Sequence, residues 1–431
     1  MTNYETYPSY KDSGVEWLGK IPEAWNTVSL RWLSRRFSGG TPDKSVPRYW
    51  SDGTIPWLAS GEVNQSIITE PTTYITDDAF RSSSAKWVPK GATLIALAGQ
   101  GKTKGMAGLL KFDSTTNQSL AAVIPNYKLQ SEYLFFFAKS AYWQLRGDAG
   151  EGKRDGLNLE ILGDLKTPLP SPAEQTAIAN FLDDKTAKID KAIAQKEQLI
   201  ALLKERKQII IQNAVTKGLD PNVKMKPSGI EWIGEIPEHW EVEKVFHHFS
   251  AKKGKDAAEL TKEYCDTISG VYPVYSGQTA NGGIMGSIDR YEFDFSDSGC
   301  LFSTTVGAKA MTCRFLKGKF SLSQNCMIFS SRNARLDHEY FYYGFLPMFE
   351  FYRSIIPDHM QASFRMEDLY QYRFLKPPED EQIAIKAHIN SNEAGILKCV
   401  EKAESAIRTL REYRATLIDS AVTGKIKVPG V

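Results

Sequence analysis

Lys102 and Lys104 are well suited by type and spacing to hold a phosphate group, because both lie in the glycine-rich stretch Gly99–Gly105. Small residues let a backbone come close to a phosphate, and the lysines add positive charge. Gly101-Lys102-Thr103 ends like a nucleotide-binding P-loop, but that motif also needs glycine at position 96, where this chain has Ala96. The stretch therefore indicates either a loop that faces a nucleic-acid backbone or an ordinary solvated turn, and not a nucleotide site.

Short basic runs could supply further phosphate contacts, although charge runs are more often solvated faces. One run, which consists of Lys252, Lys253 and Lys255, lies just after the middle of the chain. Arg35-Arg36 is its rough positional counterpart in the first half. The candidate cations in these and neighbouring segments are Lys44, Arg48, Lys252, Lys253, Lys255 and Lys309. The net charge of the chain is only +2, so nucleic-acid binding would depend on such local groups rather than on an overall polycation.

Amide side chains form a second group of candidates, because paired donors and acceptors can recognise the edges of bases. They occur in turn segments of both halves of the chain: Gln65, Asn117, Gln118, Gln278, Asn281, Gln324 and Asn325. Gln324 lies 206 positions after Gln118, in a similar segment. A position shared by both halves cannot explain different base preferences, so this pair is equally open to a structural role.

The residues do not indicate catalysis, a cofactor or a metal. His247-His248 has no cysteine or carboxylate at ligand spacing. A DNA adenine methyltransferase needs an Asn/Asp-Pro-Pro-aromatic motif, and the one Pro-Pro pair, Pro377-Pro378, has the wrong flanks. A nuclease needs clustered carboxylates beside a lysine, but Asp183-Asp184-Lys185 falls on the solvated side of an expected helix. We therefore expect a binding protein without turnover of its own.

Composition and length set the class of protein. A chain of 431 residues with 42% hydrophobic residues is expected to fold into at least two globular domains. The five cysteines include no CxxC pair, which is typical of reduced thiols in a cytosolic protein. No apolar run approaches the roughly 20 residues that span a bilayer, and the first residues lack an apolar signal core. These features predict a soluble, cytoplasmic protein without membrane contact.

The chain contains an internal repeat. Ser13–Trp25 reads SGVEWLGKIPEAW and Ser228–Trp240 reads SGIEWIGEIPEHW, with nine of thirteen positions identical. The repeated segments, here called the arms, start 215 residues apart, about half the length of the chain. A duplicated unit implies a duplicated or two-fold target. Trp17, Trp25, Trp232 and Trp240 are kept in both arms and are therefore expected to anchor packing rather than to stack on bases.

Each arm precedes a variable segment and then a long helical segment. Ser171 and Glu174 can form a capping box, no glycine or proline follows until after Thr216, and Glu381–Thr423 repeats Glu174–Thr216 at an offset of 207. Both helices carry a heptad seam. Its apolar members are Ile189, Ile193, Ile200, Leu203, Ile210, Ile396, Val400, Ile407, Leu410 and Leu417. Lys207 and Arg414 occupy equivalent seam positions, where a cation could set the register, extend to solvent or form a salt bridge.

The pattern predicts an α/β (α+β) protein with two mixed globular domains, separated by two long antiparallel helices that form a coiled coil. The expected parts are 1–170, 171–217, 218–376 and 377–431, in the order domain, helix, domain, helix. Two separate amphipathic helices, each covering its own domain, are the alternative. The repeat is also circular, because joining the C-terminus to the N-terminus would recreate the middle junction. Both chain ends should therefore lie close together, in a pseudo-two-fold arrangement.

These features resemble the specificity subunit of a type I restriction–modification system. The arms, the Glu-Gln helix starts at Glu174–Gln175 and Glu381–Gln382, and the Ala-Val-Thr helix ends carry the resemblance. The first variable segment also has Ser38–Pro42, Tyr49-Trp50, Ile55–Leu58 and Ser60-Gly61, which resemble motifs of the family's recognition domains. The second segment departs from them, with Tyr272–Gly277 instead. We expect a shared domain fold with different loops.

The resemblance implies a non-catalytic protein that binds double-stranded DNA. Each recognition domain would read one half of an asymmetric bipartite site, and the helices would set the length of the unread spacer. The helices would also dock methyltransferase subunits, of which two are expected. Restriction subunits would join through the assembled complex. A coiled-coil structural scaffold and a stand-alone DNA-binding protein are the alternatives. The half-site sequences and the spacer length do not follow from the residues.

Overall fold

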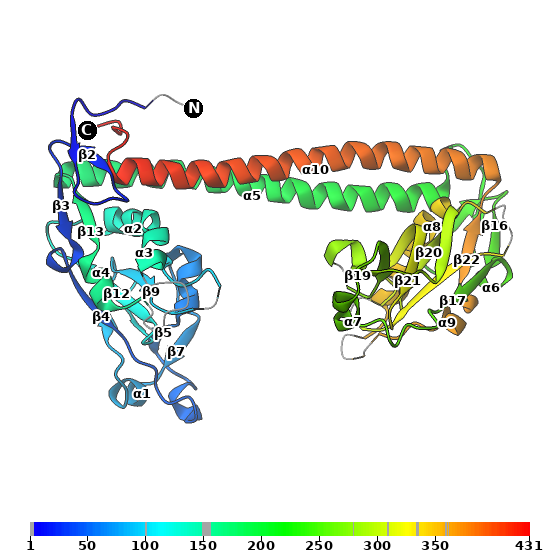
Figure 1. The fold of residues 1–431 in the computed structure, drawn as a ribbon, viewed down its shortest axis with the longest axis horizontal. Helices are drawn as coiled ribbons and strands as arrows, with labels where there is room; N and C mark the ends of the chain where they lie inside the picture. The colour runs from blue at the N-terminus through cyan, green and yellow to red at the C-terminus, as the bar shows by residue number, and fades with distance from the viewer. Residues whose placement is uncertain are drawn as a thin grey trace. The chain divides into compact units, whose positions relative to one another are not determined.

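The computed structural model places the chain in two compact units (Figure 1). Unit 1 comprises Met1–Lys196 and Glu404–Val431, and unit 2 comprises Glu197–Ala403. The residues that the structure describes are 4–99, 101–148, 157–278, 280–307, 310–332, 336–357, 360 and 362–431. Each unit thus combines one arm, one variable segment and a part of each long helix.

Unit 1 contains two sheets whose strands are interleaved along the chain. The five-stranded sheet has the order β4 (Ser34–Ser38), β12 (Leu120–Pro125), β9 (Thr93–Ala96), β10 (Ala107–Leu110) and β6 (Ile67–Ile68). The four-stranded sheet has the order β7 (Thr73–Ile75), β5 (Ile55–Leu58), β11 (Ser114–Thr116) and β8 (Trp87–Val88). Strands β9 and β10 are buried throughout, which explains their continuous apolar sequence.

Short pairs and helices complete unit 1. The first arm and the residues just before it form the hairpin β1 (Tyr10–Asp12) and β2 (Lys20–Pro22), and β3 (Asn26–Ser29) pairs with β13 (Lys166–Leu169). The helices are η1 (Leu30–Trp32), η2 (Pro47–Tyr49), η3 (Ser60–Gln65), α1 (Asp77–Arg81), α2 (Ser131–Ser140), α3 (Tyr142–Asp148) and α4 (Leu159–Asp164). Helix α2 contributes a continuous buried run from Tyr133 to Ala138, so this aromatic segment is part of the core.

Unit 2 is built around one six-stranded sheet. Its order is β17 (Phe249–Lys252), β22 (Cys326–Ser331), β20 (Phe293–Thr304), β21 (Cys313–Leu322), β18 (Tyr272–Tyr275) and β19 (Ile284–Ile288). The second arm and the residues just before it form the hairpin β14 (Met225–Pro227) and β15 (Glu235–Pro237), and β16 (Glu241–Lys244) pairs with β23 (Arg373–Lys376). The helices are α6 (Val245–His248), α7 (Lys262–Thr267), η4 (Ala280–Gly283), α8 (His338–Ser354) and α9 (Met366–Gln371).

The two units share one strand plan. In unit 1, β5 and β11 form a parallel pair with Trp57 opposite Thr115. In unit 2, β18 and β21 form a parallel pair with Val274 opposite Ser321, which lies 206 positions after Thr115. The long strands β20 and β21 of unit 2 take the places that unit 1 fills with the shorter strands β8, β9, β10 and β11. The expectation of a shared fold with different loops is therefore confirmed.

The long helices are α5 (Pro172–Lys217) and α10 (Glu379–Val422). They pair in antiparallel fashion inside each unit, as the ion pair between Asp190 and Arg414 shows in unit 1 and that between Lys207 and Glu393 shows in unit 2. Of the possible roles of the seam cations, the structure shows the salt bridge. The predicted capping box also forms, with Ser171 N–H donating to Glu174 (3.0 Å) and Glu174 N–H donating to Ser171 Oγ (3.3 Å).

The predicted seam residues are all shielded from solvent to some degree. Five of them, Ile189, Ile193, Ile396, Ile407 and Leu417, are buried. The other five, Ile200, Leu203, Ile210, Val400 and Leu410, are half-buried. The outward-facing positions between them are largely exposed, so the apolar surface of each helix is a narrow stripe, as in a coiled coil.

The two arms make equivalent contacts with the helix ends. Trp25 and Trp240 are fully buried, and their indole N–H groups donate to Glu174 (3.3 Å) and Glu381 (2.9 Å) respectively. The expectation that these two tryptophans anchor packing is confirmed. A glycine with a left-handed backbone, at φ +74° in both cases, packs beside each indole: Gly424 beside Trp25 and Gly218 beside Trp240.

The repeat is circular in its contacts. Gly218 follows α5 directly, whereas Gly424 follows α10 and reaches the first arm through space. Lys427 N–H donates to the carbonyl of Glu5 (2.7 Å), and the Tyr10 hydroxyl donates to the carbonyl of Gly424 (3.1 Å). The chain ends therefore lie together, as expected (Figure 1).

The predicted fold class, a mixed α/β protein with two long helices, is confirmed. The five cysteines are free thiols, of which Cys399 is exposed. Among the residues that the structure describes, no helix combines the length and apolar character needed to cross a membrane.

The circular junction yields a stability prediction for Gly424→Ala. A Cβ atom at this position would lie 2.3 Å from Pro22 Cδ and 3.0 Å from Trp25 Cζ3, in addition to the cost of the left-handed backbone. We expect a loss of unfolding free energy of about 1–2 kcal/mol from the backbone and about 1–3 kcal/mol from overpacking. The measurement is urea unfolding followed by tryptophan fluorescence.

Gly14→Ala is the matched control in the same unit. Gly14 has φ +70°, but a Cβ atom there would meet nothing within 4 Å, so only the backbone cost applies. Equal losses for the two variants would show that the contact between Gly424 and the first arm contributes nothing to stability.

Candidate nucleic-acid interface

Four loops of unit 1 meet at the end of the parallel strands β5 and β11, and we call this place the loop edge of the unit. Gly40 N–H donates to the carbonyl of Thr116 (2.8 Å), which joins the loop after β4 to the end of β11. Asn117 N–H donates to the carbonyl of Leu58 (2.9 Å), at the end of β5. Leu97 N–H, after β9, donates to the carbonyl of Ser119 (2.8 Å). Backbone hydrogen bonds thus fix the four loops to one another.

Glycine is required where the loop after β4 crosses β11. A Cβ atom on Gly39 would lie 1.9 Å from the carbonyl oxygen of Thr116, so no other residue fits without a backbone shift. Trp57 Nε1 donates to the carbonyl of Gly40 (2.9 Å) from below. The Ser38–Pro42 motif therefore allows this loop to pack against the ends of the strands.

The loop that carries Lys102 and Lys104, here called the lysine loop, is held by side chains of α3 that donate hydrogen bonds to its backbone carbonyls. The Tyr142 hydroxyl donates to the carbonyl of Lys102 (2.8 Å), and Arg146 Nη1 donates to the carbonyls of Gly101 (3.2 Å) and Lys104 (3.1 Å). The side chain of Lys102 is exposed and that of Lys104 is half-buried. Tyr142 and Arg146, both on α3, were not found by sequence reasoning, because nothing in their spacing relates them to a loop about 40 residues earlier.

The amide candidates of unit 1 lie at this edge, but some of their hydrogen-bonding groups already bind other residues of the protein. Gln118 is exposed and accepts from the Thr41 hydroxyl (2.5 Å), whereas Asn117 Oδ1 accepts from Ser119 N–H (3.1 Å). Gln65 is exposed at the end of η3, and its Nε2 donates to the buried carboxylate of Glu62 (2.6 Å). The structure thus brings Asn117 and Gln118 together, and places Gln65 on the loop that follows β5.

Lys44 and Arg48 lie on the exposed loop between β4 and β5. Arg48 forms an ion pair with Asp78 (3.6 Å) that is largely open to solvent, and such pairs contribute little stability. Asp43 accepts from the N–H (2.9 Å) and hydroxyl (2.7 Å) of Ser45, and these hydrogen bonds lower the pKa of its carboxyl group. The turn that carries Lys44 is therefore ordered by its neighbours.

Unit 2 has a loop edge of the same construction. Ser323 N–H donates to the carbonyl of Tyr275 (2.9 Å), as Asn117 does to Leu58. Thr305 N–H donates to the carbonyl of Asn325 (2.8 Å), as Leu97 does to Ser119. The candidates Gln324 and Asn325 are exposed here, and Asn325 has a left-handed backbone at φ +62°. Both units thus share these two backbone hydrogen bonds at the ends of their parallel strands. The third bond differs, because Lys255 N–H, at the place of Gly40, donates to Glu292 Oε1 (2.8 Å).

The strand register corrects the match proposed for the basic run of unit 2. In the antiparallel pair of β17 with β22, Lys252 stands opposite Ile328, and Phe37 stands opposite Ala122 in the equivalent pair of unit 1. Lys252 therefore corresponds to Phe37, whereas Arg35-Arg36 corresponds to Ser250-Ala251. The rough counterpart that the sequence suggested was wrong, because a basic residue pair carries no information on strand register.

Lys253, Gly254 and Lys255 consequently take the place of Ser38, Gly39 and Gly40. A Cβ atom on Gly254 would lie 2.9 Å from the carbonyl of Leu322, which matches the approach of Gly39 to Thr116. Lys252, Lys253 and Lys255 are all exposed. The run is thus a part of the loop edge.

Arg36 has a structural role instead. Its Nη1 donates to the carbonyls of Leu30 (3.1 Å) and Ser34 (3.0 Å), and burial followed by the charge of Arg31 lowers its pKa.

The remaining candidates of unit 2 lie on the loop that follows β18. Gln278 and Asn281 are exposed, and Gln278 Nε2 donates to the carbonyl of Ile284 (2.6 Å). Arg314, on β21, donates through Nη2 to the carbonyl of Gln278 (3.1 Å) and through Nη1 to that of Gly282. Sequence reasoning missed Arg314, since a single arginine in a strand gives no signal. The candidate Lys309 lies outside the described residues.

A half-buried lysine of unit 1 was also missed. Lys139, on α2, donates from Nζ to Ser66 Oγ (2.8 Å), on the loop that follows β5. Burial and the charge of Arg414, opposed by Asp190, lower its pKa to about 8. The lysine holds that loop against α2.

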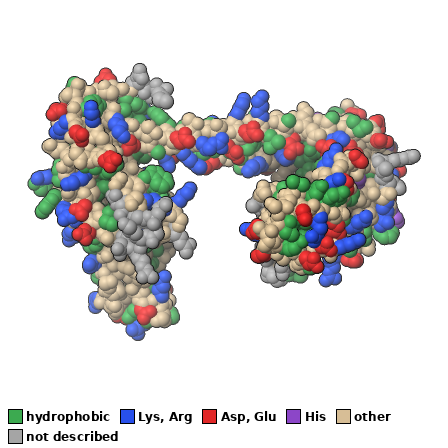
Figure 2. All heavy atoms as spheres, viewed as in Figure 1, with side chains coloured by type: hydrophobic (Ala, Val, Ile, Leu, Met, Phe, Trp, Pro, Cys, Tyr) green, Lys and Arg blue, Asp and Glu red, His purple; other side chains and the backbone are tan. Residues whose placement is uncertain are grey.

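Metal-binding side chains do not gather in the part of the chain that the structure describes, where no group of three His, Cys, Asp or Glu stands at ligand distances. His247 is exposed, and His248 forms an ion pair with Glu243 (3.6 Å). Figure 2 shows basic and acidic side chains interspersed over both units on the face in view.

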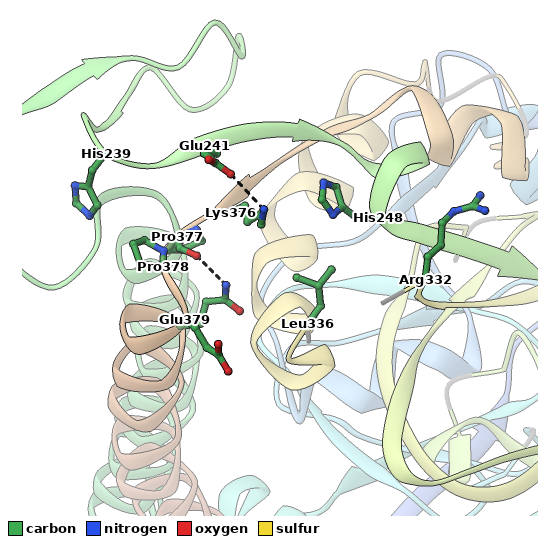
Figure 3. Close-up of a pocket in the computed structure, with 10 residues that line it drawn as sticks. His239, Glu241, His248, Arg332, Leu336, Lys376, Pro377, Pro378 and Glu379 are labelled. Carbon is green, nitrogen blue, oxygen red and sulfur yellow. Dashed lines mark hydrogen bonds and ion pairs between the residues drawn. The ribbon is translucent and has the colours of Figure 1, made fainter. Parts of the chain in front are cut away.

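A hollow of about 810 Å³ lies in unit 2 at the start of α10, away from the loop edge. Figure 3 shows its charged lining, in which Lys376 pairs with Glu241 (3.2 Å) and Gln382 Nε2 donates to the carbonyl of Pro377 (2.8 Å). The lining includes Arg332 and Leu336, which flank residues outside the description. It therefore supports no assignment of a ligand.

Comparison with known families agrees with this geometry. The model of the type I restriction modification DNA specificity domain matches residues 22–202 and again residues 237–398. This chain belongs to that family. The two matches fall on the two recognition regions, each with the start of the helix that follows it.

Relatives and solved structures extend the comparison. The EcoR124I/EcoR124II specificity subunit of Escherichia coli is 25% identical over 53% of this chain and 49% of its own. The MjaIX specificity subunit of Methanocaldococcus jannaschii is 25% identical over 60% of this chain and 59% of its own. The match thus spans roughly half the length of these curated relatives.

Solved structures support the fold. A chain from a study of complex assembly and conformational transition of the type I restriction–modification system superposes with a TM-score of 0.70, at 13% identity over 93% of this chain and 98% of that chain. The HsdS subunit from Thermoanaerobacter tengcongensis gives 0.51, at 12% identity over 94% and 98%.

The lysine loop of unit 1 leads to a binding prediction. If Lys102 contacts a phosphate, Lys102→Ala should weaken binding to duplexes of any sequence. The slope of log K against log salt should also become shallower by about 0.9, because one fewer counterion is released. Lys20→Ala, an exposed lysine of the first arm, is the control. Salt titration of duplex binding measures both, and identical slopes would exclude Lys102 from the interface.

Proposed function

We propose that this chain is the DNA specificity subunit of a type I restriction–modification complex, and that each unit reads one half of a bipartite duplex site. The observation that carries the proposal is the loop edge, which occurs in both units on the same parallel strand pair. Exposed lysines and amide side chains gather there, and these groups suit phosphate and base contacts. Membership of the family supports the same conclusion.

The two half-sites should differ in sequence. The strand plan and two of the backbone hydrogen bonds are common to both loop edges, but the side chains on them are not. Unit 1 presents Ser38 and Gly40 where unit 2 presents Lys253 and Lys255. Different side chains on one frame read different base pairs, so the target is asymmetric.

The helices should set the distance between the half-sites. Helices α5 and α10 each run without interruption from one unit into the other, so their length fixes how much chain lies between the two loop edges. Their exposed faces would dock methyltransferase subunits, two because the frame is duplicated. Restriction subunits would then join through the assembled complex in the cytoplasm.

Catalysis belongs to the partners in this proposal. The sequence contains no methyltransferase motif and no P-loop, and the loop edges present binding groups rather than a nucleophile with its base. A structural scaffold built on the coiled coil would account for the helices. It would not account for two loop edges that preserve their backbone network while their side chains diverge.

The function is tested by producing the chain with its cognate methyltransferase subunit in a host that lacks adenine methylation. Methylation-aware sequencing of that host's genome should show one split motif, methylated once on each strand, with unequal halves. The methyltransferase subunit produced alone is the control. Methylation without a split motif, or an identical pattern without this chain, would refute the proposal.

The role of the helices is tested by lengthening both at the boundary of the units. A second copy of 197–203 placed before Glu197, and of 404–410 placed before Glu404, adds one heptad to each helix and keeps the seam in register. Seven residues add about 10 Å of helix, the rise of about three base pairs. We expect the unread spacer to lengthen by about two or three base pairs, with both half-sites retained.

Insertion in α5 alone is the control for this prediction, because it leaves the seams of unequal length and should reduce folding and assembly. The measurement is again the methylated motif. A folded complex with both insertions that methylates only the original spacing would show that the helices do not set the spacer.

A further inference from the structure

Gly108 on β10 and Arg314 on β21 occupy the same place in the shared strand plan. Gly108 stands opposite Leu94 of β9, and Arg314 stands opposite Phe302 of β20. On their other sides, Leu94 and Phe302 pair with the equivalent strands β12 and β22. One position of the shared strand plan thus has no side chain in unit 1 and has a long, positively charged side chain in unit 2.

The same position supports the loop that leaves the first strand of the parallel pair. We call this segment the reader loop: 59–72 in unit 1, between β5 and β7, and 276–283 in unit 2, between β18 and β19, of which residue 279 lies outside the described residues. It carries the candidate Gln65 in unit 1 and the candidates Gln278 and Asn281 in unit 2.

In unit 1 the reader loop packs directly on the bare strand. A Cβ atom on Gly108 would lie 2.9 Å from Ile68 Cδ1 and 3.3 Å from Val63 Cα. Val63 and Ile68 are fully buried, so this loop is held by apolar packing. A side chain at this position would have to push Ile68 aside and shift the backbone at Val63.

In unit 2 the guanidinium of Arg314 fills that space, and the reader loop wraps around it. Its two terminal nitrogens donate to the carbonyls of Gln278 and Gly282, and the group stands 5.9 Å from the centre of the Phe302 ring. A Cβ atom on Gly283 would lie 1.6 Å from Nη1. Asn281, Gly282 and Gly283 have φ values of 47°, 62° and 85°, a left-handed run that the guanidinium holds in place.

We propose that this one strand position selects the conformation of the reader loop in each unit, and that Arg314 is a positioning residue for recognition of the second half-site. The proposal rests on the proposed function, since it needs the loop edge to face DNA. Arg314 acts through the loop rather than on the base. Gln278 spends one amide N–H on Ile284, and its amide also bears a second N–H and an acceptor oxygen, the pair that suits the edge of adenine.

Arg314→Lys tests the proposal because it keeps the positive charge and loses the fork of donors that spans two carbonyls. Arg373→Lys is the matched control: Arg373 is an exposed residue of β23 in the same unit, outside the reader loop. Gly108→Ala is the reciprocal variant, since its new methyl group displaces the reader loop of unit 1. Each chain is produced with the cognate methyltransferase subunit, and the methylated motif is determined as above.

We expect Arg314→Lys to reduce discrimination between the second half-site and its single-base variants by roughly tenfold, the scale of one well-placed bidentate contact. The first half-site should be unchanged. Gly108→Ala should relax the first half-site only, and Arg373→Lys should leave both intact. Loss of affinity for every sequence alike, or relaxation of both halves, would contradict a positioning role.

Hydrogen exchange of the purified chain supplies a second measurement that does not depend on DNA. Amides of the reader loop in unit 2 should exchange faster in Arg314→Lys than in Arg373→Lys, with the rest of the unit unaltered. Unchanged exchange, or faster exchange with an unchanged motif, would overturn the inference. A wild-type complex without a split motif would instead refute the proposed function, and the exchange result would still decide whether Arg314 holds the loop.

Discussion

The first turn of each long helix carries a glutamate that accepts a hydrogen bond from a fully buried tryptophan, and the arrangement of the chain depends on this contact. Glu174 accepts the hydrogen bond from Trp25, and Glu381 accepts that from Trp240. A buried indole N–H left without a partner is costly, so the arm is held where the helix starts. The neighbouring glutamine secures the same point: Gln175 Nε2 donates to the carbonyls of Lys128 and Pro170. Because arm, helix start and the end of the other helix meet here, the Glu-Gln pair and the tryptophan persist in both copies while the domains between them diverge.

The loop edges show how much can change on a fixed frame. The backbone network joins strand ends through N–H and carbonyl groups, which every residue except proline provides, so it places almost no demand on side chains. Glycine is needed in the loop edges where two backbones approach closely, as at Gly39, Gly40 and Gly254. The side chains of the loops are therefore free to vary, and the difference between Gly108 and Arg314 shows that even a strand position can differ when the loop above it differs as well.

The sequence predicts the parts that depend on local or periodic signals. The arms, the capping box at Ser171 and the heptad seams are visible because each needs particular residues at fixed spacing. The match of Lys252 to Phe37 was not visible, because strand register is set by pairing with distant strands. The contacts of Tyr142, Arg146 and Arg314 were missed for the same reason, since each joins segments more than 30 positions apart through backbone carbonyls, which carry no residue code. The sequence thus indicated where the candidate groups lie, but not which side chains hold them.

The two units also place their cations differently on the shared frame. Unit 1 has Lys104 where unit 2 has the fully buried Ala310, and unit 2 has Lys253 and Lys255 where unit 1 has Ser38 and Gly40. Phosphate attraction depends on the number of cations near the backbone and is indifferent to base sequence, so it can be supplied from either loop. In the proposed function, base reading depends on the conformation of the reader loop, which a separate strand position supports. Because different residues would then carry the two tasks, affinity and sequence preference could change independently in each unit. Local cations could thus hold a duplex at two places in a chain with a net charge of only +2.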